Sequence, residues 1–149
     1  KFQNALDFVC TEMAKKIAKD GEGATKLIEV NAKNAKTEED AKKIAKSVVS
    51  SNLVKCAIFG KDVNWGRLMC AIGNSGAKFN ESNIDIYFDN EKIVENGKGA
   101  NYDVEKIKKI MDKDALKITI DLKNGKGNAT AYGCDMSYNY IKINAEYTT

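Results

Sequence analysis

A glutamate between two glycines is the residue of this sequence best placed for chemistry. Glu22 stands in the segment DGEG, between Gly21 and Gly23. Glycines allow a backbone to approach a ligand closely, so a carboxylate in this loop is suited to bind an amino group or to exchange a proton. The alternative is an exposed acidic turn residue without a ligand. The residue types alone leave both interpretations open.

The nucleophiles that this chain can activate are limited by its composition. The 149 residues include no histidine, so a Ser-His or Cys-His nucleophile cannot be built within the chain. The four cysteines Cys10, Cys56, Cys70 and Cys134 include no C-x-x-C pair. Their spacing does not suggest a zinc site and instead predicts buried free thiols. We expect no metal and no cofactor.

The only tryptophan and the only arginine stand together in residues 62–67, DVNWGR. Asp62 and Asn64 are residue types that cap helices, and Trp65 is a large apolar side chain. This pattern predicts a junction between a loop and a helix, with Asp62 or Asn64 as the cap and Trp65 packed against the fold.

Glycine pairs of the form G-x-G occur at residues 21–23, 97–99 and 125–127. None continues to the G-x-G-x-x-G of a dinucleotide-binding loop, so nucleotide binding is not favoured. The formal net charge is +3. Lysine supplies nearly all of the positive charge, without the forked donors that read bases, and we expect no nucleic-acid partner.

The longest apolar run is a few residues, whereas a membrane-spanning helix needs about 20. The first residues, KFQNALDFVC, lack a signal-peptide pattern. These features predict a cytoplasmic protein without a membrane partner.

Hydrophobic spacing predicts one α+β domain over residues 1–149, in which helices and β-hairpins are mixed. Thr37, followed by three acidic residues, is typical of a capped helix start. Residues 53–59 and the tail 137–149 are compatible with helix or strand. The remaining expected elements are helices at 2–19, 37–48, 65–72 and 104–111, a strand at 25–32, a hairpin of strands 84–88 and 92–94, and a second hairpin of strands 116–122 and 128–134.

Segments spread along the whole chain resemble one family when they are taken together and in order. They are residues 20–26 (DGEGATK), 51–60 (SNLVKCAIFG), 62–67 (DVNWGR), 129–135 (ATAYGCD) and 137–149 (SYNYIKINAEYTT). They resemble the C-terminal part of the β chain of ornithine acetyltransferase, or glutamate N-acetyltransferase, the ArgJ type of arginine biosynthesis.

The resemblance implies an α/β sandwich-like fold and an enzyme that cleaves its own precursor into α and β chains. The new N-terminal threonine of the β chain would take acetyl from N2-acetylornithine and pass it to glutamate. Some members also use acetyl-CoA, and the usual assembly is an α2β2 heterotetramer. Thr11 and Thr25 do not match the nucleophile, which would lie upstream with the N-terminal part of the β chain. The oxyanion hole would lie in the α chain. We therefore expect no catalytic residue in this chain and no activity from it alone.

Three substrate-binding positions of the family fall on Glu22, Asn144 and Thr149. A substrate ammonium group is suited to a carboxylate, such as Glu22 or the terminal carboxylate of Thr149. A substrate carboxylate is suited to amide donors, which Asn144 offers.

The alternative function is a non-catalytic small-ligand or interaction domain that kept the scaffold and lacks the nucleophile.

Overall fold

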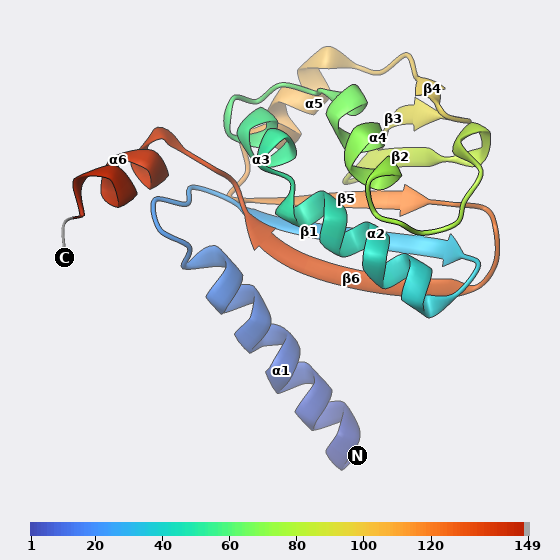
Figure 1. Ribbon diagram of the computed structural model, residues 1–149, viewed down its shortest axis with the longest axis horizontal. Coiled ribbons are helices and arrows are strands. Elements are labelled where there is room, and N and C mark those ends of the chain that lie inside the picture. Colours follow the sequence, from blue (N-terminus) through green and yellow to red (C-terminus); the bar gives the residue numbers. More distant parts are fainter. Residues whose placement is uncertain (148–149) are drawn as a thin grey trace.

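The computed structural model describes residues 1–147 as helices packed on one mixed β-sheet (Figure 1). This confirms the predicted α+β class. The helices are α1 (Phe2–Lys19), α2 (Glu38–Ser50), α3 (Asn52–Phe59), α4 (Trp65–Gly73), α5 (Val104–Met111) and α6 (Tyr138–Glu146), with a short 3-10 helix at Glu81–Asn83. The strands are β1 (Leu27–Ala35), β2 (Asp85–Phe88), β3 (Glu91–Glu95), β4 (Lys98–Gly99), β5 (Ala115–Asp121) and β6 (Gly127–Cys134).

The strands lie in the order β4-β3-β2-β5-β1-β6, with β1 near one edge and β5 beside it. β1 and β5 are parallel, and every other neighbouring pair is antiparallel. Residues alternate between the two faces of each strand. Ile28, Val30 and Ala32 of β1 point into the core, and Ile118 and Ile120 of β5 share that buried face.

Helices α2 to α5 lie on the same side of the sheet in Figure 1. The helix α2 contributes Ile44 and Val48 to the core, and α5 contributes Ile107 and Met111. Thr37 caps α2 as predicted, because its hydroxyl accepts a hydrogen bond from the backbone N–H of Asp40 at 3.0 Å.

The other sheet face is polar, and α1 lies at its edge. Tyr132 of β6 is paired with Glu29 of β1, which points away from the core. The ammonium group of Lys15 lies 5.7 Å from the centroid of the Tyr132 ring, so the C-terminal half of α1 lies beside β6, and the N-terminal half extends away from the sheet (Figure 1). None of the residues of α1 or of α6 is buried.

Two segments were left open between helix and strand by the sequence: residues 53–59 lie within the helix α3, and residues 137–149 include the helix α6. The hairpin of residues 84–94 is confirmed, since β2 and β3 pair antiparallel around Asp89 and Asn90.

The second predicted hairpin is wrong, although both of its strands exist. β5 and β6 do not pair, because β1 lies between them. The connection from β5 to β6 instead crosses the end of β1, where the N–H of Asn124 bonds to the carbonyl of Asn34 at 2.8 Å. A Cβ at Gly127 would lie 2.2 Å from the carbonyl oxygen of Thr37. Gly127 therefore allows the backbone after β5 to pass close to the residues that follow β1, and it does not form a tight turn between two paired strands.

The prediction of buried thiols is also wrong. Cys10, Cys56 and Cys70 are exposed and Cys134 is half-buried, all as free thiols. In α3 and α4 the core-facing residues include Val54 and Leu68. Residues two positions apart on a helix point in different directions, so Cys56 and Cys70 face away from the core. Across residues 1–147, no helix combines the length and the apolar character needed to span a bilayer.

Candidate functional site

The structure brings Glu22 and Asn144 into direct contact, although 122 positions separate them in the sequence. Glu22 lies in the loop of residues 20–26 between α1 and β1, and Asn144 lies in the last turn of α6. The Nδ2 atom of Asn144 donates to Oε2 of Glu22 at 2.9 Å. Both side chains are exposed, so the pair is accessible to a ligand.

The orientation of the Asn144 amide follows from its two acceptors. Its Nδ2 also donates to the backbone carbonyl of Tyr140 at 2.8 Å. Because the Glu22 carboxylate and the Tyr140 carbonyl only accept, both N–H bonds of Asn144 are used here and its Oδ1 remains available as an acceptor. The pair thus presents carboxylate and amide oxygens, which suit an ammonium group better than an anion.

The loop that carries Glu22 is fixed at its far end by a buried aspartate. Asp135 follows β6 and is 3% exposed. Its carboxylate accepts hydrogen bonds from the backbone N–H of Thr25 at 2.8 Å, from the N–H of Lys26 at 3.0 Å and from the Thr25 hydroxyl. Charged acceptors form stronger hydrogen bonds than neutral ones, so this group anchors the loop to the end of β6.

Lys26 secures the same loop to α5. Its ammonium group, on a side chain that is almost fully buried, donates to the carbonyl of Met111 at 2.7 Å and to that of Lys113. These carbonyls lie at the C-terminal end of α5, where a cation is favoured by the helix dipole. The residue directly before β1 is therefore held against the end of α5.

A serine connects the Glu22 loop to the Asn144 helix. Ser137 is 4% exposed. Its hydroxyl donates to the carbonyl of Gly23 and accepts from the N–H of Asn139 at 3.2 Å, which caps α6. Neither Ser137 nor Asp135 was predicted from the sequence as a site residue. The available signal was a serine directly before the amphipathic tail, which is a residue type typical of a helix N-cap.

Thr149, the third expected substrate-binding residue, lies outside the described residues 1–147. In the motif at residues 62–67 the predicted helix cap is confirmed, whereas Trp65, predicted to pack against the fold, remains 38% exposed. The side chain of Asn64 caps α4 by accepting from the N–H of Arg67 at 3.2 Å, and Trp65 lies against Gly99. Arg67 also donates to the carbonyl of Leu53 at 3.1 Å, which joins α4 to α3.

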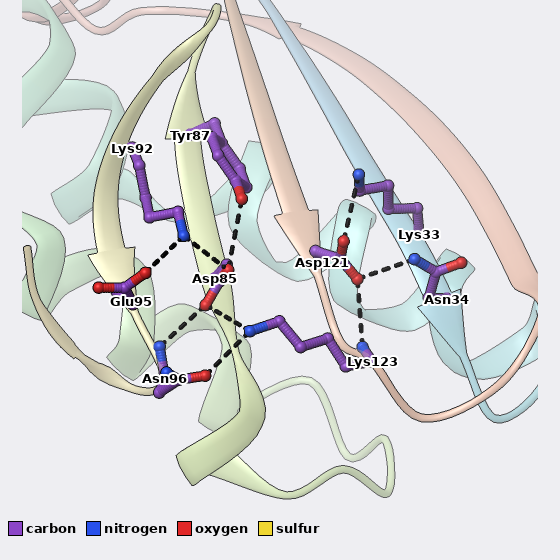
Figure 2. A network of polar contacts seen from close by, with 9 residues as sticks. All are labelled: Lys33, Asn34, Asp85, Tyr87, Lys92, Glu95, Asn96, Asp121 and Lys123. Carbon is purple, nitrogen blue, oxygen red and sulfur yellow. Dashed lines mark hydrogen bonds and ion pairs between the residues drawn. The ribbon is translucent and has the colours of Figure 1, made fainter.

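A second group of charged residues lies at the opposite end of the sheet, where β1 and β5 finish and β2 begins (Figure 2). Asp85 is 4% exposed. Its carboxylate accepts from Lys123 at 2.8 Å, from the N–H of Asn96 at 2.8 Å and from Lys92 at 3.2 Å. Burial raises the pKa of Asp85, but these hydrogen bonds outweigh burial and lower its pKa to about 2.

Asp121 in the same group is paired with Lys33 at 3.1 Å and with the amide of Asn34 at 2.9 Å. Burial raises its pKa, and the hydrogen bonds from Asn34 and Lys33 lower it further than burial raises it. Both carboxylates are thus matched by donors of the chain itself. This network stabilises the turns at one end of the sheet and offers no open carboxylate for chemistry. Within residues 1–147, no cluster of three or more acidic or cysteine side chains is suited to hold a metal ion.

Comparison with known proteins gives consistent matches over the whole chain. The model of the ArgJ family matches residues 1–149. The arginine biosynthesis bifunctional protein ArgJ 1 of Clostridium acetobutylicum is 53% identical over 150 residues, which are 98% of this chain and 37% of that protein. A glutamate N-acetyltransferase of Methanocaldococcus jannaschii is 50% identical over 157 residues, which cover all of this chain and 39% of that protein.

The fold matches a solved structure equally well. The crystal structure of the arginine biosynthesis bifunctional protein ArgJ from Bacillus halodurans superimposes with a TM-score of 0.94 at 43% identity, covering 98% of this chain and 69% of that one. The chain thus spans less than two fifths of the length of these curated relatives.

Proposed function

This chain belongs to the ArgJ family, and we propose that it is the C-terminal part of the β chain of a glutamate N-acetyltransferase. The whole enzyme would transfer acetyl from N2-acetylornithine to glutamate. The names of the relatives support this activity, because one is a glutamate N-acetyltransferase and another is a bifunctional protein of arginine biosynthesis.

The contact between Glu22 and Asn144 is the observation that carries the proposed role of this chain. N2-acetylornithine has a free ammonium group at the end of its side chain. Glu22 offers it a carboxylate whose direction is set by Asn144. A charge-assisted hydrogen bond to an ammonium group would hold the substrate in one orientation. In this proposal Thr149 adds its terminal carboxylate to the same site.

The reacting group would be an N-terminal threonine outside this chain. Its hydroxyl would attack the acetyl carbonyl of N2-acetylornithine, release ornithine and hold the acetyl group as an ester. The amine of glutamate would then attack the ester and leave with the acetyl group. An N-terminal threonine uses its own amine as the base. The reaction as proposed therefore needs no histidine from this chain, which has none.

The proposal includes the further features implied by the family resemblance. These are autocatalytic cleavage of a precursor, an α2β2 assembly with the α chain and the N-terminal part of the β chain, acetyl-CoA as a second donor in some members, and a cytoplasmic location. The exposed apolar side chains of α1 and α6, such as Phe2, Ile17 and Ile141, support packing against other parts of the enzyme.

An assay of acetyl transfer in the full-length enzyme tests this function. The enzyme is incubated with N2-acetylornithine and glutamate, and N-acetylglutamate and ornithine are quantified over time. We expect equal amounts of the two products without added acetyl-CoA. Hydrolysis of N2-acetylornithine without formation of N-acetylglutamate would contradict the proposal. The 149-residue chain alone serves as the control and is expected to be inactive.

A further inference from the structure

We propose that Ser137 is a positioning residue, which sets the distance between Glu22 and Asn144 by joining the loop of one to the helix of the other. This inference rests on the proposed function and extends it to a residue that touches neither substrate nor reacting atoms. The supporting observation is that one buried hydroxyl forms hydrogen bonds to both the loop of Glu22 and the helix of Asn144.

The two hydrogen bonds of Ser137 connect neighbours of the two site residues. The carbonyl that it bonds belongs to Gly23, the residue after Glu22, and the N–H that it caps belongs to Asn139 in the first turn of α6. Because Ser137 is 4% exposed, water has little access to replace either bond.

Direct backbone contact supports the same connection. Gly23 has a φ of +65°, and a Cβ at this position would lie 2.7 Å from the backbone nitrogen of Tyr140. The loop therefore lies against the first turn of α6 with no room for a side chain. Only glycine combines this conformation with such a close approach.

The helix α6 depends on these contacts because it buries none of its residues. Near its start, Tyr138 packs edge-on against Phe59 with the ring centroids 5.4 Å apart. Asn144 lies seven residues after Ser137, which is roughly 10 Å along the helix axis. A tilt of about 10° at Ser137 would then move Asn144 by about 2 Å, enough to break a hydrogen bond of 2.9 Å to Glu22.

Kinetics of the full-length enzyme test the role of Ser137. The variants are Ser137→Ala, which removes both hydrogen bonds, and Ser137→Thr, which keeps the hydroxyl. Thr37→Ala is the matched control, because Thr37 also caps a helix through its hydroxyl but follows the end of β1, at the opposite end of that strand from the loop of Glu22. Each variant is measured alone and combined with Glu22→Gln, with the concentration of active sites determined by titration.

We expect Ser137→Ala to raise KM for N2-acetylornithine at least about fivefold with a smaller change in kcat. Ser137→Thr should restore most of the loss, and Thr37→Ala should leave KM within about twofold of the wild type. In the Glu22→Gln background, Ser137→Ala should change KM by less than about twofold, because the two residues act through one contact. A merely structural role would lower the number of active sites and leave KM unchanged.

The results that would overturn the role of Ser137 can be distinguished from those that would overturn the role of Glu22. An unchanged KM in Ser137→Ala, or an equal effect with and without Glu22→Gln, would remove the positioning role while the proposed function stands. A wild-type KM in Glu22→Gln would remove the binding role of Glu22 itself, and the role of Ser137 with it. If Ser137→Ala does not fold, Ser137→Cys, which is close in size and a weak donor, replaces it under the same criteria.

Discussion

The buried carboxylate of Asp85 makes a quantitative prediction about stability. Asp85→Asn removes the charge that pairs with Lys92 and Lys123 while nearly preserving the shape of the side chain. The pKa of Asp85 is about 2 in the folded chain, against an ordinary value of 3.8 for this carboxyl. At about 1.36 kcal/mol per pKa unit, this difference corresponds to about 2 kcal/mol of stability at neutral pH.

The sign of the pH dependence follows from the lowered pKa. Folding favours the ionised form of Asp85, so its contribution to the free energy of unfolding is almost fully present above about pH 4. As the pH falls towards 2, the folded carboxylate becomes protonated and the contribution is lost. The asparagine variant lacks this contribution at every pH, so the stability difference between the two proteins should shrink over the same interval.

Urea unfolding of the 149-residue chain at pH 7, pH 4 and pH 2 measures this effect. We expect the free energy of unfolding of Asp85→Asn to be about 2 kcal/mol lower at pH 7, with an unchanged dependence on urea. Asp112→Asn is the control, because Asp112 pairs with Lys61 at the exposed surface and should have little effect. Equal stability of Asp85→Asn and the wild type at pH 7 would refute the reasoning, and so would a difference that persists undiminished at pH 2.

Three further predictions concern the backbone crossing, a helix cap and the precursor. Gly127→Ala should destabilise the chain by roughly 1–3 kcal/mol in urea unfolding, because its Cβ would meet the Thr37 carbonyl at 2.2 Å; an unchanged stability would argue against the crossing. Asn64→Ala should cost about 1 kcal/mol in the same assay through loss of the α4 cap, and no loss would exclude the cap. Mass spectrometry of the expressed full-length gene product should detect two polypeptides, the second beginning with threonine, whereas one uncut polypeptide would contradict precursor cleavage.

The sequence predicted those elements whose signals are local. The alternating residues of β1 and β5 and the cap at Thr37 identified their strands and helix. The hairpin of β2 and β3 was also predicted, because its two strands are neighbours in sequence and in the sheet. The false hairpin of β5 and β6 shows the limit of this approach. The glycines at 125 and 127 are compatible with a tight turn or a close crossing, and only the position of β1 decides between them.

In the candidate site too, only the residue with a local signal was identified from the sequence. The residues alone singled out Glu22 as a loop carboxylate, whereas Asn144 entered through the family resemblance. Their contact across 122 positions depends on where α6 lies, and the sequence left the tail open between helix and strand. Ser137 and Asp135 were missed because most of their partners are backbone groups, such as the Gly23 carbonyl and the N–H of Thr25. Backbone groups carry no sequence signature, so such contacts become visible only in the folded chain.

The catalytic effect of Glu22→Ala in the full-length enzyme tests the central claim most directly. The kcat/KM for acetyl transfer from N2-acetylornithine to glutamate is compared with that of the wild type and of Glu39→Ala, another exposed glutamate, which lies in the first turn of α2. We expect a loss of at least about tenfold for Glu22→Ala, equivalent to about 1.4 kcal/mol of transition-state stabilisation, and little change for Glu39→Ala. Wild-type kinetics from Glu22→Ala would contradict the assignment of Glu22 to the substrate site.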